Sequence, residues 1–163
     1  MKTLEIEIAI MREFDIRRNL IVPNITTMSG LVPFEVDMLV LSKRGYATGV
    51  EIKVSRGDLK ADLKKRQWAR LDFPKMKDHY FGRFKYFNYA VPAKLKEAAL
   101  EQIPEWCGLY VADTVYERTR LHLVRQPERL YNKKWSDLEM YEVARLGAMR
   151  IYGLKITHLA AQL

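Results

Sequence analysis

Short apolar runs separated by turn-forming residues recur along this chain, and each is about the length of one strand. They predict strands at about 34–41, 49–54, 85–91 and 108–112, with weaker candidates at 19–27 and 120–124. Pro23 interrupts one of the weaker runs, so that strand is expected at a sheet edge or to be irregular, because proline has no N–H to donate. Turn chemistry between Ser42 and Tyr46 is expected to join the first two strong strands as a hairpin.

Between these runs, apolar residues recur at helical spacing. They predict helices over 4–17, from Ser55 or Asp58 to about Arg70, over 93–102, and over about 136–152. Thr3 is the expected N-cap of the first helix. Ser136 and Glu139 form the capping-box pattern that opens the last one. Helices alternating with strands in this way predict an α/β fold.

Composition is typical of one globular domain, spanning residues 1–163. With 48% hydrophobic and 29% charged residues, the chain does not resemble a disordered one. No run approaches the roughly 18 apolar residues of a membrane-spanning helix, and the start MKTLEIE is not typical of a signal peptide, so no membrane partner is expected. The single cysteine, Cys107, leaves no internal disulfide, which favours a reducing, cytoplasmic location.

Three ionisable residues lie inside two adjacent predicted strands, where a charge is costly unless it is paired or bound to metal. Asp37 is in the run FEVDMLVL, and Glu51 and Lys53 are in the run GVEIKVS. Because side chains alternate across a strand, Glu51 and Lys53 point to one face and Ile52 points to the other. If the strands pair as a hairpin, Asp37 can join that face. Two carboxylates and an ammonium in one space indicate a metal site that acts on a phosphate.

The charge of the chain favours a polyanionic partner. The formal net charge is +8, and the window from Arg56 to Lys85 holds ten basic and four acidic residues, a local excess of six. A run of charges is most often a solvated helix face. Beside a candidate metal site, this one is better interpreted as a track for the phosphate backbone of a nucleic acid. The residues expected to contact nucleic acid are Arg56, Lys60, Lys64 and Lys65.

The element order and the motif residues together resemble the PD-(D/E)XK nuclease superfamily, which has the restriction-endonuclease-like fold. Asp37 stands at the place of the second-strand aspartate, and the E-x-K element is matched by Glu51 and Lys53, beginning fourteen residues later. Val36 stands where the family name has proline. The stretches VEIKVSRGDLKADLKK, YFNYAVP and PEWCGLYVAD look like the MmcB-like branch of DNA-repair and phage-encoded proteins. This resemblance covers about 20–113 and implies an αβββαβ core, with a mixed central sheet flanked by helices.

The resemblance also implies an activity, which is metal-dependent hydrolysis of phosphodiester bonds in DNA during repair, recombination or phage genome processing. Asp37, Glu51 and the carbonyl of Ile52 would hold Mg²⁺, with Mn²⁺ as a substitute. Lys53 would orient the attacking water and stabilise the charge that develops on the phosphate. The superfamily often adds a glutamate from the first helix, and Glu7 is the choice here.

The sequence leaves several alternatives open. Glu5 competes closely with Glu7 for the place of the helix glutamate. Asp58, Asp62 and Lys65 share one face of a helix, and the two acids are interpreted as members of a salt-bridge ladder on its surface. The alternative function is a nucleic-acid-binding module that keeps the nuclease fold without cutting. A homodimer would let two sites act on two strands. The sequence determines neither the oligomeric state nor whether the substrate is DNA or RNA.

Overall fold

The computed structural model describes residues 1–64, 80–130 and 133–161. The helices are α1 (Thr3–Glu13), α2 (Arg56–Leu63), α5 (Lys96–Gln102) and α6 (Asp137–Ala160), with short 3-10 turns at Thr27–Ser29 and Ala93–Leu95. The strands are β1 (Leu20–Ile25), β2 (Val36–Leu41), β3 (Ala47–Ile52), β4 (Tyr86–Pro92), β5 (Gly108–Val115) and β6 (Arg118–Arg125). The fold is therefore α/β, as the sequence predicts.

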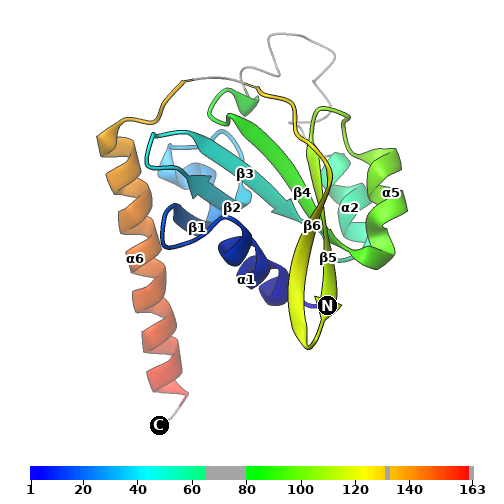
Figure 1. Cartoon of the computed structure of the whole chain (residues 1–163). Helices are drawn as coiled ribbons and strands as arrows, with labels where there is room; N and C mark the ends of the chain where they lie inside the picture. The colour runs from blue at the N-terminus through cyan, green and yellow to red at the C-terminus, as the bar shows by residue number, and fades with distance from the viewer. Residues whose placement is uncertain (65–79, 131–132, 162–163) are drawn as a thin grey trace.

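The strands form one six-stranded mixed sheet in which spatial order follows chain order (Figure 1). The first three strands are antiparallel neighbours, β3, β4 and β5 are parallel, and β6 returns antiparallel to β5. Each parallel step needs a crossover, and α5 fills the one between β4 and β5. The edge position expected for the strand that holds Pro23 is confirmed, since β1 pairs with β2 alone.

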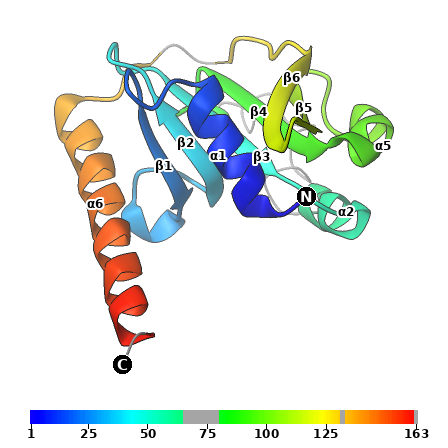
Figure 2. The same cartoon turned by 60° about the horizontal axis from the view of Figure 1, so that its bottom comes forward.

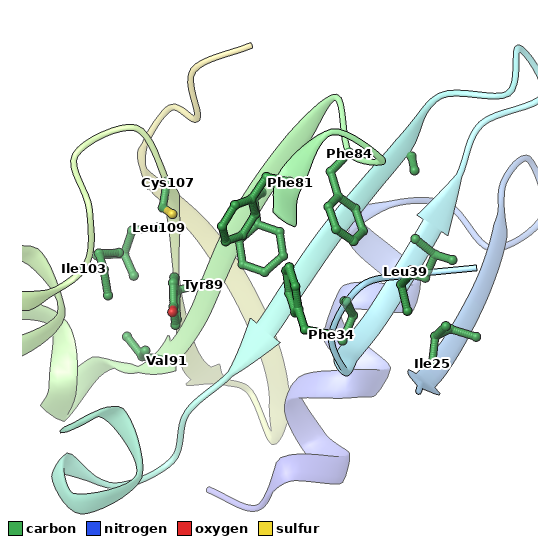
Figure 3. Close-up of a cluster of buried hydrophobic side chains, with 14 of the residues drawn as sticks. Ile25, Phe34, Leu39, Phe81, Phe84, Tyr89, Val91, Ile103, Cys107 and Leu109 are labelled. Carbon is green, nitrogen blue, oxygen red and sulfur yellow. The ribbon is translucent and has the colours of Figure 1, made fainter. Parts of the chain in front are cut away.

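Two hydrophobic layers cover the two faces of the sheet. On one face α1 inserts Ile6 and Ile10 against Val40 and Val50, and Figure 2 shows this helix lying across the strands. On the other face α2 and α5 pack beside an aromatic cluster. Its rings include Phe34, Phe81, Phe84, Phe87 and Tyr89, several of them in contact at centroid distances of 5.0–6.3 Å (Figure 3). Burial of these side chains provides the main driving force for folding.

The first helix differs from its prediction at both ends. Its N-cap is Lys2 instead of Thr3, because the Glu5 carboxylate accepts a hydrogen bond from the Lys2 backbone N–H at 2.6 Å. It ends at Glu13, four residues before the predicted end, and the chain turns at Asp15, which adopts a φ of 45°. Asx side chains tolerate this left-handed conformation better than most others do, and the sequence pattern of apolar residues does not report it.

The last helix begins as predicted and runs longer. Ser136 and Glu139 form the expected capping box, and Val143 packs with the core beside β1. The helix continues past the predicted end at Tyr152 to Ala160, and its final turns project away from the sheet (Figure 1). Exposed apolar side chains there are Ile151, Tyr152, Leu154, Ile156 and Leu159. Among the described residues, no helix combines the length and the apolar character needed to cross a bilayer.

Candidate active site

A lysine surrounded by three carboxylates lies at the carboxyl end of β3. Lys53 follows the last residue of that strand and is only 4% exposed. Its Nζ lies 2.8 Å from Glu51 Oε2, 3.3 Å from Asp62 Oδ1 and 3.7 Å from Asp37 Oδ2. The expected convergence of Asp37, Glu51 and Lys53 on one place is therefore found, although their chemical roles stay a prediction.

The β2–β3 hairpin explains why these side chains meet. Met38 pairs with Val50 across the hairpin, so the neighbouring Asp37 and Glu51 project together from the opposite face. Asp37 is held in place by the backbone, because its Oδ2 accepts a hydrogen bond of 2.7 Å from the N–H of Ile52. The sheet thus places one carboxylate from each strand beside the same ammonium.

The position of Asp62 differs from the surface salt-bridge ladder that the sequence suggests. Its side chain is 1% exposed, it forms an ion pair with Lys53, and its Oδ2 accepts a hydrogen bond of 2.7 Å from the Tyr89 hydroxyl on β4. Asp58, in contrast, is exposed as expected. The signal that could have separated the two acids is Leu59, which is fully buried and lies three residues before Asp62 on the same helix face.

Burial makes the charge on Glu51 costly. It raises the pKa of this carboxyl to about 8, with Asp37 and Asp62 adding to the rise and Lys53 opposing it. Burial would lower the pKa of the Lys53 ammonium, but Glu51 and Asp62 outweigh that effect and raise it, so the lysine stays charged. The single ammonium of Lys53 therefore forms ion pairs with three carboxylates. Glu51 Oε1 is buried with no hydrogen-bond partner among the described residues, which leaves an oxygen available for another cation.

The structure favours Glu7 over Glu5 as the glutamate from the first helix. Burial and the nearby charge of Asp37 raise the pKa of the Glu7 carboxyl, which is half-buried on α1. Glu5 is exposed, and its carboxylate is engaged by the N–H of Lys2. Partial burial and the charge of Asp37 thus favour Glu7, and its role in catalysis remains a prediction.

The donor atoms at the site fit a hard divalent cation such as Mg²⁺, which prefers carboxylate and carbonyl oxygens. Asp37 has a side chain 27% exposed, so the cluster is open on one side, and Glu51 contributes its unpartnered oxygen. In the ranges that the structure describes, no group of three or more His, Cys, Asp and Glu side chains is arranged as a metal centre. The ammonium of Lys53 lies between the carboxylates instead.

Basic side chains lie on α2, the helix that begins shortly after Lys53. Ser55 caps this helix by accepting a hydrogen bond from the Asp58 N–H at 3.1 Å. The helix and its C-cap display Arg56, Lys60 and Lys64 as exposed side chains. Lys65, the fourth residue expected to contact nucleic acid, lies outside the described residues, as does most of the basic window that follows it.

Comparisons with known proteins define the fold and no activity. No protein-family model matches the chain, and no curated protein matches it. The chain is similar to the solved structure of a protein of unknown function from Silicibacter pomeroyi, with a TM-score of 0.56 and 18% sequence identity. The match covers 93% of this chain and 86% of that chain. At this identity the likeness shows a shared fold alone.

Proposed function

We propose that this protein is a metal-dependent nuclease of the PD-(D/E)XK type, with a restriction-endonuclease-like core, that hydrolyses phosphodiester bonds in DNA. One observation carries the proposal. Two carboxylates from a β-hairpin and the following lysine converge in a half-open site, and a helix with exposed basic side chains begins beside them. A purely structural role gives no reason to keep a buried carboxylate of raised pKa at this place.

Each residue of the site would have a separate role in phosphodiester hydrolysis. Asp37, Glu51 and the carbonyl of Ile52 would hold Mg²⁺, which supplies charge neutralisation on the phosphate and an acidified water. Lys53 would donate to the phosphate oxygen on which negative charge develops, because its ammonium is held charged and oriented by carboxylates on several sides. Glu7 would add a further carboxylate that orients the water.

The alternative is a nucleic-acid-binding module that keeps this fold without cutting. The exposed bases of α2 favour it as much as they favour a nuclease, since both functions need contact with phosphates. Glu51 distinguishes the two, because binding alone has no need of a buried carboxylate. A cytoplasmic location and a homodimer remain predictions.

Cleavage of labelled nucleic acids tests the proposal directly. We expect the purified protein to cut at least one member of a panel of single-stranded, double-stranded and branched DNA with Mg²⁺ or Mn²⁺, and none with chelator. RNA counterparts in the same panel decide between the two polymers. Glu7→Gln should reduce the rate by about tenfold or more, whereas Glu5→Gln, on the exposed side of the same helix, should leave it unchanged. If the panel is bound and nothing is cut with either metal, the binding module is the correct function.

Binding should depend strongly on salt. Each phosphate contact adds about 0.9 to the log–log slope of affinity against salt on duplex DNA. Replacing both Lys60 and Lys64 with alanine is therefore expected to lower the slope by about two and to weaken binding, measured by fluorescence anisotropy in chelator. Lys155→Ala, in the exposed last turns of α6, is the matched control. An unchanged slope in the double variant would place the binding surface elsewhere.

A further inference from the structure

A pocket of about 320 Å³ lies on the face of the sheet that is opposite to the lysine cluster. Its wall includes Asn88, which pairs in register with Val50 on β3. Val50 packs in the layer under α1, whereas Glu51, the next residue, points to the other face. The pocket is thus separated from the candidate active site by the thickness of the sheet.

A buried amide forms the floor of this pocket. Asn88 is 2% exposed, and its Oδ1 has no hydrogen-bond partner among the described residues. A side-chain amide has two donors and an acceptor oxygen, and leaving the buried oxygen unpaired costs free energy. Gly108 on the neighbouring strand makes room for the amide, since a Cβ there would lie 2.0 Å from Asn88 Oδ1. The local structure therefore accommodates a buried amide oxygen that no described residue satisfies.

Aromatic side chains form the walls above this amide. They are Phe14, Tyr86 and Tyr110, and polar side chains of Thr48 and Gln126 complete the lining. Phe14 and Tyr110 pack edge to face, with ring centroids 5.8 Å apart and planes inclined at 66°. Lys85 Nζ lies 5.2 Å from the Tyr86 ring and places a positive charge near one wall.

These features select for one class of ligand. Aromatic walls favour a ring that can pack against them, and a side-chain amide favours a ring whose edge can form hydrogen bonds. Burial and the carboxylate of Glu13 raise the pKa of Tyr110, so a negative charge lies near that wall. The Lys85 ammonium lies near the Tyr86 wall, and the two opposite charges together favour neither an anion nor a cation. A neutral heterocycle fits all of these conditions.

We propose that this pocket binds a nucleobase, with the amide of Asn88 reading its hydrogen-bonding edge. The base is either that of a free nucleoside or one turned out of a nucleic-acid strand. The pocket is a second site on the opposite face of the sheet from the lysine cluster, and its occupancy does not depend on whether that cluster cleaves DNA.

Titration with uncharged nucleosides tests the proposal, because they lack the phosphates that the basic helix would attract. The four deoxynucleosides are added to the full chain, and the side-chain amide resonances of Asn88 and Gln126 are followed by NMR. We expect at least one nucleoside to shift the Asn88 resonance with saturable binding. A response to none of them and to no oligonucleotide, up to about 10 mM, would overturn the proposal.

Variants separate recognition from folding. Asn88→Leu removes an amide whose buried oxygen has no partner among the described residues and keeps the branched shape of the side chain, so the variant should melt at the same or a higher temperature. Its affinity for the nucleoside should nevertheless fall by about tenfold or more. Tyr86→Leu, which changes a half-buried side chain of the wall, should weaken binding as well. For these variants binding is followed through the Gln126 resonance. Glu51→Gln, on the opposite face, should bind the nucleoside like the parent. Parent-like binding in Asn88→Leu and Tyr86→Leu would refute the assignment.

Oligonucleotides identify the source of the base. A short single strand that binds more tightly than the nucleoside, and loses that gain when the favoured base is replaced by an abasic site, indicates a base held within a strand. Nucleoside binding that the oligonucleotide does not match indicates a site for the free compound. Either result supports base recognition at Asn88. A failure of nucleosides and oligonucleotides to bind here is distinct from a failure of cleavage, because this titration contains no metal.

Discussion

Glu51→Gln is expected to abolish divalent-cation-dependent cleavage and, at the same time, to make the protein more stable. The amide keeps the shape of the side chain but removes the charge needed to hold a cation. Loss of a preorganised electrostatic contact in a catalytic site typically costs about a hundredfold or more in rate. The variant should still bind DNA like the parent in chelator, because the basic side chains of α2 are unchanged.

The gain in stability follows from the crowding of charge around Lys53. Three carboxylates share this one ammonium, with oxygens at 2.8, 3.3 and 3.7 Å, so the buried cluster carries excess negative charge when all are ionised. Removing one of these charges leaves Lys53 paired with Asp37 and Asp62. We expect the free energy of unfolding to rise by about 1 kcal/mol or more, as is common when a functional residue is replaced.

This gain should depend on pH with a defined sign. Burial raises the pKa of the folded Glu51 carboxyl from 4.5 to about 8, so the folded state holds this proton more tightly than the unfolded state does. The contribution of Glu51 to stability is therefore fully present below about pH 4.5 and is lost as the pH rises to about 8. The advantage of Glu51→Gln over the parent should grow across the same window.

Chemical denaturation of both proteins between about pH 5 and 8 measures this difference. Glu101→Gln, on the exposed surface of α5, is the matched control and should change neither stability nor cleavage. Cleavage by Glu51→Gln at the rate of the parent would show that the activity comes from another site. A variant that is inactive and also less stable than the parent at pH 8 would contradict the account of the charge cluster.

Lys53→Met is expected to have the largest effect on folding of any change in the site. Methionine matches the length of the aliphatic stem but leaves three buried or half-buried carboxylates without their cation. Removing one partner of a buried ion pair typically costs about 3–5 kcal/mol, a large part of the stability of a domain this size. The loss should shrink as the pH falls, because the carboxylates can then take up protons.

A second substitution tests whether the cause is charge. Adding Glu51→Gln to Lys53→Met removes one of the uncompensated carboxylates, so the double variant should be more stable than Lys53→Met alone. Lys60→Met, on the exposed face of α2, is the control for loss of a lysine and should change the free energy of unfolding by less than about 0.5 kcal/mol. If Lys53→Met unfolds like the parent, the ammonium does not hold the carboxylates together.

Local patterns in the amino-acid sequence are enough to predict the helices and strands and the part of the site that lies along one hairpin. Strand-length apolar runs and capping residues are local signals, and they predict the strands and the start of α6. Alternation within a strand and pairing in a hairpin also act over short distances. These local rules were enough to predict that Asp37, Glu51 and Lys53 meet in one place.

Which other residues lie beside these three depends on the packing of elements that are distant in the chain. Asp62 is brought to Lys53 because α2 folds back onto the sheet and Tyr89 on β4 donates a hydrogen bond to it. The choice of Glu7, and the unpaired amide of Asn88 beside Gly108, likewise depend on which face of which neighbour each residue meets. Sequence spacing reports the period of a helix or strand. It does not report the packing of one element on another, which is what separates a buried acid from an exposed one on the same helix.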